Sequence, residues 1–154
     1  AQVQDGLGCP LVLAGREDPR WPQVRQMAAQ LGLEEGVRFL GDVPEADLPA
    51  IYNLASLFVM PSLYEGFGLP LAEAMASGVP CVSSDAGSLP EVAGEAALLV
   101  DPRDVRAMGE AMLRVLSDPA LAGQMRERGL AQAAKFSWAS AARQTVEVYR
   151  QCAA

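Results

Sequence analysis

The sequence predicts an α/β fold with three layers, in which a parallel sheet of about five strands lies between two layers of helices. Short apolar runs alternate with segments of helical spacing, as in parallel βα units. The apolar runs are rich in Val and Leu and show little polar alternation, so we expect both faces of the sheet to be covered. Gly15, Gly32 and Gly78 stand at the ends of such segments, where turns and helix C-termini favour glycine.

The expected strands are the runs that are short and apolar enough to be buried. They are Leu11–Ala14, Val37–Leu40, Leu57–Met60, Val79–Ser83 and Ala97–Val100. Helices are expected between them where apolar residues recur every three or four positions. These are Gln23–Leu31, Ala46–Ala55 and Pro70–Ser77, the last with a proline in its first turn.

Further helices are expected after the last strand, at Arg103–Leu116, Pro119–Phe136 and Trp138–Gln151. No apolar run of strand type separates them. The C-terminal part of the chain is therefore predicted to be a helical tail rather than another βα unit.

The composition excludes several classes of protein. At 154 residues the chain has the length of one domain, and its net charge of −7 without a basic stripe argues against a nucleic-acid partner. The absence of histidine excludes Ser-His-Asp and Cys-His catalysis within the chain and most zinc sites. Cys9, Cys81 and Cys152 lie far apart, which fits a reducing compartment. No apolar run approaches the length of a transmembrane segment.

The most informative segment is 61–75, which predicts an anion site. Gly66 and Gly68 allow the backbone to come close to a ligand. A proline then opens a helix, whose first N–H groups and dipole favour a bound phosphate. Glu65 and Glu73 place one carboxylate on each side of this anion site. A phosphate between two carboxylates that bind hydroxyl groups is the arrangement expected for a nucleotide-sugar.

The run from Glu65 to Glu73 resembles the E-x7-E motif, usually EGFGLPxxE, of retaining glycosyltransferases with two Rossmann-like domains, family 4 (group 1) in particular. The similarity extends over nearly the whole chain. The other matching segments are 41–44 (GDVP), 72–84 (AEAMASGVPCVSS), 88–97 (SLPEVAGEAA) and 136–138 (FSW). The resemblance implies a Rossmann-like three-layer domain that forms one half of a GT-B-type enzyme.

The resemblance also implies roles for the two carboxylates. Glu73 is expected to accept hydrogen bonds from the ribose hydroxyls, since a carboxylate can serve a vicinal diol. Glu65 is expected to be the catalytic carboxylate, which faces the donor sugar, orients it and stabilises positive charge near the anomeric carbon. The alternatives are an ordinary exposed helix glutamate at 73 and, at 65, a loop glutamate that caps the following helix.

Backbone groups are implied to bind the rest of the donor. The N–H groups of Gly66, Phe67, Gly68 and Leu69 are expected to contact sugar hydroxyls and the diphosphate. The side chains of Phe67 and Leu69 alternatively serve only for packing. Val43 is expected to hold the base through its backbone, with an ordinary strand-to-helix loop as the alternative.

The remaining candidates flank these segments. Gly15 and Arg16 are expected to contribute to donor binding, although Arg16 is equally well interpreted as a solvated charge. Trp21 is expected to pack on the following helix, and Glu91 to cap or brace the active-site loops. Asp85 belongs to no D-x-D metal-binding pattern, so we expect no metal and no other cofactor; the helix N-terminus neutralises the diphosphate instead.

Two parts of such an enzyme are not recognised in the sequence. Family members open this domain with a strand, a Gly-Arg turn and a Lys-Gly pair that clamp the diphosphate, and they bind the acceptor in a separate N-terminal domain. We therefore interpret residues 1–154 as a C-terminal, donor-binding domain that lacks its first strand and helix and its N-terminal partner domain. By itself such a chain is expected to be inactive in transfer.

The implied function is retaining transfer of a hexose from a nucleotide-sugar to a glycan or lipid-linked acceptor. The segment 88–92 and Trp21 favour a mannosyl donor such as GDP-mannose. The expected location is cytoplasmic, or peripheral to the inner face of the membrane through the missing domain. Two alternatives stay open: a non-catalytic module that binds nucleotide-sugars, and a glycogen-synthase-like or epimerase-like enzyme on the same scaffold.

Overall fold

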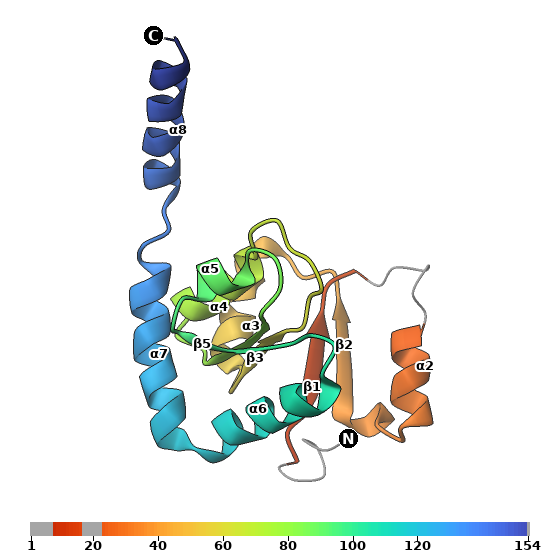
Figure 1. Cartoon of the computed structure of the whole chain (residues 1–154). Coiled ribbons are helices and arrows are strands. Elements are labelled where there is room, and N and C mark those ends of the chain that lie inside the picture. The colour runs from red at the N-terminus through yellow and green to blue at the C-terminus, as the bar shows by residue number, and fades with distance from the viewer. Residues whose placement is uncertain (1–7, 17–22, 154) are drawn as a thin grey trace. The chain divides into compact units, whose positions relative to one another are not determined.

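The computed structural model describes residues 8–16 and 23–153 (Figure 1). The chain divides into two compact units, Ala1–Ile51 and Tyr52–Ala154. Each unit is described by itself below.

Unit 1 is a two-stranded parallel sheet with a helix. Strand β1 (Leu11–Ala14) pairs with β2 (Val37–Gly41), and Leu11 lies opposite Val37. Helix α2 (Gln23–Gln30) and the 3-10 helix η1 (Glu34–Gly36) connect the two strands. A second 3-10 helix, η2 (Glu45–Asp47), follows β2 and leads into α3 (Leu48–Leu54), whose last turn belongs to unit 2.

Unit 2 contains a three-stranded parallel sheet in the order β3-β4-β5. Its strands are β3 (Phe58–Met60), β4 (Cys81–Ser84) and β5 (Ala97–Val100). The central strand β4 is buried at all four residues. Helices α4 (Leu69–Ala76) and α5 (Leu89–Ala93) form the two crossovers of this sheet.

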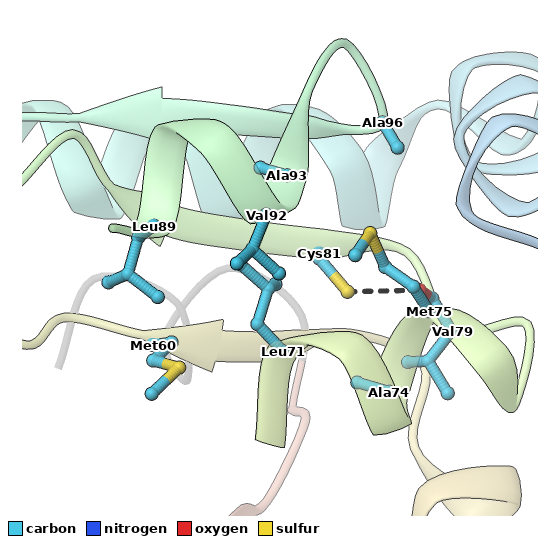
Figure 2. Packing of buried hydrophobic residues seen from close by; sticks show 10 residues of the cluster. All are labelled: Met60, Leu71, Ala74, Met75, Val79, Cys81, Leu89, Val92, Ala93 and Ala96. Carbon is cyan, nitrogen blue, oxygen red and sulfur yellow. Dashed lines mark hydrogen bonds between the residues drawn. The ribbon is translucent and has the colours of Figure 1, made fainter. Parts of the chain in front are cut away.

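Both faces of the unit 2 sheet are covered. Cys81 of β4 packs in a buried cluster with residues of α4 and α5, shown in Figure 2. The next residue, Val82, points to the opposite face and packs with Met108 and Val115 of α6 (Val105–Ser117) and Met125 of α7 (Pro119–Ala133). The alternation of strand side chains therefore divides the core into two layers, as the sequence predicted for a covered parallel sheet.

The helices of unit 2 end at capping residues that are visible in the sequence. Asp104 caps α6 by accepting from the Ala107 N–H at 2.8 Å, and Asp118 caps α7 by accepting from the Leu121 N–H at 3.0 Å. Gly78 ends α4 with a φ of 69°, a left-handed conformation that favours glycine. After α7, a short connection leads to α8 (Trp138–Ala153), which has no buried residue.

All five predicted strands form and all of them pair in parallel, as one two-stranded and one three-stranded sheet. The expected coverage of both faces is wrong for β1, where Leu11 and Val12 are 44% and 45% exposed. The physical reason is that a two-stranded sheet has no central strand, so a single helix cannot enclose either strand. Along β1 and α2 an open apolar groove of about 290 Å³ remains.

Several helix boundaries also differ from the prediction. Helix α5, which is only five residues long, was not predicted. Helix α6 begins two residues later than predicted, because Asp104 is its N-cap. Helix α7 was predicted to extend to Phe136, whereas it ends at Ala133, and the predicted end of α8 lies two residues before Ala153. Differences of this size at helix ends are common because terminal turns fray.

Candidate functional site

The candidate site of unit 2 lies where β3 and β4 end. The loop 61–68 follows β3, and the loop 85–88 follows β4. Because the carboxyl ends of neighbouring parallel strands meet at one edge of a sheet, the two loops lie side by side. This is the edge at which open α/β sheets bind ligands.

Hydrogen bonds from serine hydroxyls hold the first loop in place. The Ser88 hydroxyl lies 3.0 Å from the carbonyl oxygen of Glu65 and 2.9 Å from that of Phe67. The Ser84 hydroxyl donates to the carbonyl oxygen of Ser62 at 2.6 Å. The two loops also approach closely at Gly87, where an added Cβ would lie 3.2 Å from backbone atoms of Glu65. Backbone carbonyls of the loop are thus bound by serine side chains of β4 and of the start of α5.

Glu65 is half-buried within this loop, and the Ser62 hydroxyl donates to its Oε1 at 2.9 Å. Helix α4 begins after Gly68 and has no hydrogen bond from a capping side chain. The alternative reading of Glu65 as a helix cap is therefore wrong. Its carboxylate is oriented by a hydroxyl at the mouth of the site instead.

The start of α4 is the segment for which the sequence predicted an anion site. Gly68 is buried with a φ of 99°, and an added Cβ there would lie 2.5 Å from Cδ2 of Leu89. Its carbonyl oxygen accepts from the Leu71 N–H at 3.0 Å, and Pro70 has no N–H to offer. Leu69 is thus the residue of the first turn whose N–H is not used within the helix. Together with the helix dipole, this N–H favours a negative group at the mouth.

Glu73 extends from α4 and is not an isolated surface glutamate. The Tyr52 hydroxyl donates to its Oε2 at 2.9 Å. The Tyr52 ring is half-buried and packs edge-on against Phe58, with ring centroids 5.7 Å apart. Burial, followed by the hydrogen bond and the charge of Glu73, raises the pKa of the Tyr52 phenol. The phenol therefore remains a proton donor to this carboxylate at neutral pH.

The side chains of Phe67 and Leu69 differ in their surroundings. The Phe67 ring packs edge-on against Phe136, which follows α7, with centroids 5.5 Å apart. Packing is thus confirmed for Phe67. Leu69 is 51% exposed at the mouth of the loop, so packing does not account for its side chain.

Gly15, Arg16 and Val43 lie in unit 1, after the strands β1 and β2. The Gly15 N–H donates to the Gly41 carbonyl at 2.9 Å. The Arg16 guanidinium pairs with Asp42 through Nη2 at 2.8 Å and Nε at 3.0 Å, although both side chains are largely exposed. The hydrogen bond and the charge of Asp42 raise the pKa of Arg16. An exposed pair of this kind contributes little to stability.

Other predicted residues contribute differently. Trp21 lies outside the described residues. Glu91 is exposed in the first turn of α5 and, within the described part of the chain, makes no hydrogen bond to the loops. The bracing role assigned to it belongs to Ser88, because a hydroxyl at the start of α5 reaches two loop carbonyls that the longer side chain does not contact. Among residues 8–16 and 23–153, no group of acidic, cysteine or histidine side chains could hold a metal ion.

The residues that orient the two carboxylates were not predicted from the sequence. Ser62 lies next to the motif, and only its position three residues before Glu65 could have indicated its role. Tyr52 lies in a different helix, and no local pattern connects it with Glu73.

Comparison with known proteins then assigns the family. The family model for glycosyl transferases group 1 matches residues 1–118 of this chain. The chain belongs to this family. It is 46% identical over 146 residues to O-antigen chain mannosyltransferase B of Escherichia coli, covering 92% of this chain and 37% of that protein. It is 40% identical over 148 residues to an MMP alpha-(1->4)-mannosyltransferase of Mycolicibacterium hassiacum, covering 94% of this chain and 36% of that protein.

Solved structures show the same relationship. Sucrose-phosphate synthase from Thermosynechococcus elongatus superposes with a TM-score of 0.84 at 34% identity, covering 92% of this chain and 38% of that one. HepE of Anabaena, solved with UDP and glucose, has a TM-score of 0.83 at 24% identity, covering 97% and 44%. The fold is thus the Rossmann-like α/β fold of GT-B-type glycosyltransferases. The chain spans little more than a third of the length of the curated relatives named above. Within the described residues no helix has the length and apolar character needed to cross a bilayer.

Proposed function

We propose that this chain is the donor-binding part of a retaining hexosyltransferase. One observation carries the proposal: two carboxylates, each oriented by a hydroxyl group, flank a glycine loop and a helix start that no side chain caps. In this arrangement Glu73 accepts from the ribose hydroxyls, and the loop and helix N–H groups contact the diphosphate. Glu65 then faces the hexose, with the Ser62 hydroxyl holding one of its oxygens.

The charge distribution fits this division of roles. The helix dipole and the N–H groups around Leu69 favour the diphosphate, including the negative charge that grows on it as the glycosidic bond breaks. The carboxylate of Glu65 favours the positive charge that develops at the anomeric carbon. The chain supplies both groups from one loop and one helix start, without a metal ion in the proposed reaction.

The donor is proposed to be GDP-mannose and the acceptor a glycan or lipid-linked glycan. The two curated relatives described above, at 46% and 40% identity, are named mannosyltransferases, which supports the hexose. HepE was solved with UDP, so a UDP-hexose is the alternative donor. The proposed location is the cytoplasm or the inner face of the membrane.

The test is a titration of the full-length protein with GDP, UDP and ADP and with their hexose conjugates, followed by calorimetry. We expect GDP and GDP-mannose to bind most tightly and GDP-mannose to be consumed when acceptor is present. Tighter binding of UDP would change the proposed donor to a UDP-hexose and would leave the proposed transferase activity in place. Binding without turnover of any hexose conjugate would favour the non-catalytic module instead, and no binding of any nucleotide would overturn the proposal.

A further inference from the structure

The contact between Tyr52 and Glu73 joins two helices that lie apart in the sequence. Tyr52 is on the last turn of α3, and Glu73 is 21 positions later on α4. Its hydroxyl donates to one carboxylate oxygen of Glu73 at 2.9 Å. Both residues belong to unit 2, so the contact lies within one compact body.

The Tyr52 ring has little freedom to leave this position. It packs edge-on against Phe58 of β3, with an interplanar angle of 70°, and lies against the buried cluster of unit 2. A tyrosine side chain is rigid compared with other polar side chains, because only two torsions set its direction. A ring fixed at the core therefore presents its hydroxyl at a fixed point beside α4.

Glu73 by itself would be mobile. Its side chain is exposed, and a glutamate on a helix surface can populate several rotamers. One hydrogen bond from a fixed phenol selects the rotamers that keep Oε2 at the phenol. An ionised carboxylate has about four lone-pair sites, so the contact leaves acceptor capacity for a diol.

We propose that Tyr52 is a positioning residue for donor binding, which holds the Glu73 carboxylate in the orientation that accepts the ribose hydroxyls. The inference rests on the proposed function, because it assigns the ribose to Glu73. Tyr52 itself does not contact the donor in this arrangement. Its effect is to remove the loss of rotamer freedom that Glu73 would otherwise undergo on binding.

The raised pKa of Tyr52 agrees with this role. Burial is its largest cause, and the hydrogen bond and charge of Glu73 add to it. The facing groups are the Glu73 carboxylate and the Cys81 thiol, which is itself buried and has its pKa raised to about 12 by burial. Both favour the protonated phenol. The contact is therefore expected to persist throughout the pH range in which the protein is folded and Glu73 is ionised.

A double-mutant cycle on the full-length protein tests the inference. The variants are Tyr52→Phe, Glu73→Ala and the double variant, and the readout is the dissociation constant for GDP and for UDP. We expect Tyr52→Phe to weaken nucleotide binding by about threefold to tenfold, and Glu73→Ala to weaken it by about tenfold or more. The double variant is expected to match Glu73→Ala alone, because the phenol acts only through that carboxylate.

The controls separate positioning from general stability. Phenylalanine keeps the ring contact with Phe58, so the melting temperature should change little, and kcat at saturating donor should stay near wild type while KM for the donor rises. Tyr149→Phe, on the exposed surface of α8, should change neither the melting temperature nor the KM for the donor. Additive effects in the double variant, or an unchanged Kd for Tyr52→Phe beside a weakened Glu73→Ala, would overturn the inference alone. An unchanged Kd for Glu73→Ala would overturn the ribose assignment on which it rests.

Discussion

At the scale of single residues, the site depends on hydroxyl groups that orient carboxylates. Ser62 donates to Oε1 of Glu65, and Tyr52 donates to Oε2 of Glu73. In both pairs one carboxylate oxygen is held and acceptor capacity remains. A site prepared in this way has less freedom to lose when a polar ligand binds.

Glu65→Gln is the direct test of the carboxylate that we propose to face the hexose. Glutamine keeps the size of the side chain and an oxygen for the Ser62 hydroxyl, but it removes the negative charge. We expect kcat to fall by about a hundredfold and the Kd for the free nucleotide to stay within about twofold, because the charge acts on the transition state. Steady-state kinetics and calorimetry on the full-length protein measure the two quantities. Glu91→Gln, at an exposed glutamate of α5, is the control. A change confined to nucleotide affinity would assign Glu65 to nucleotide binding instead.

The two glycines of the loop are expected to respond differently to alanine. At Gly68 a Cβ would collide with Leu89 at a positive φ, so Gly68→Ala should lower the free energy of unfolding by about 1–3 kcal/mol. Gly66 has open space within 4 Å and no positive φ, so Gly66→Ala should change stability by less than about 0.5 kcal/mol. Denaturant unfolding compares them. If Gly66→Ala nevertheless weakens donor binding, the cause is a clash between the added methyl group and the ligand, because the fold is unaffected. A Gly66→Ala variant as unstable as Gly68→Ala would contradict this distinction.

At the scale of elements, the candidate loop is attached to the helical tail. The edge-on contact between Phe67 and Phe136 connects the loop before α4 with the segment after α7. Hydroxyl groups of β4 and of the start of α5 bind carbonyl oxygens of the same loop. The aromatic pair is thus a second attachment of the loop.

Phe136→Ala is expected to loosen the loop without unfolding the core. Both rings are partly exposed, so the lost contact should cost about 0.5–1.5 kcal/mol of stability beyond the area that it uncovers. Nucleotide affinity should fall by severalfold, because the Gly66–Gly68 backbone is less well ordered before binding. Trp138→Ala, two positions further and 83% exposed, is the matched control and should leave affinity unchanged. Equal effects of the two variants would show that the tail as a whole, rather than this ring contact, supports the loop.

Local patterns were sufficient to predict most elements of unit 2. The apolar run of β3, the glycine loop and the proline at the start of α4 are nearly contiguous, and each carries its own signal in the sequence. The contact of Tyr52 with Glu73 was not predictable, because it depends on how α3 and α4 pack on β3. The exposure of β1 was mispredicted for a related reason. Apolar runs report the tendency of a strand to be buried, whereas the number of neighbouring strands decides whether it is.

At the scale of the whole molecule, the two units differ in how much apolar surface they bury. Unit 2 holds two buried clusters on the two faces of its sheet. In the described part of unit 1 the buried apolar residues are Ala28 and Val37, each 9% exposed. The groove of about 290 Å³ beside them is lined mainly by apolar side chains, several of which are exposed and so contribute little hydrophobic stabilisation.

Hydrogen exchange of the chain should reveal this difference. The amides of β4 lie between two strands and two helix layers, so they should open only with global unfolding. The amides of β1 and β2 belong to a two-stranded sheet with one exposed strand, and we expect them to exchange at least about tenfold faster. Native-state exchange followed by NMR gives both rates in one sample, and α8 serves as an internal reference because none of its residues is buried. Equal protection of β2 and β4 would mean that the two units unfold as one cooperative body. In that case the stability of unit 1 would derive from contacts outside its own small core.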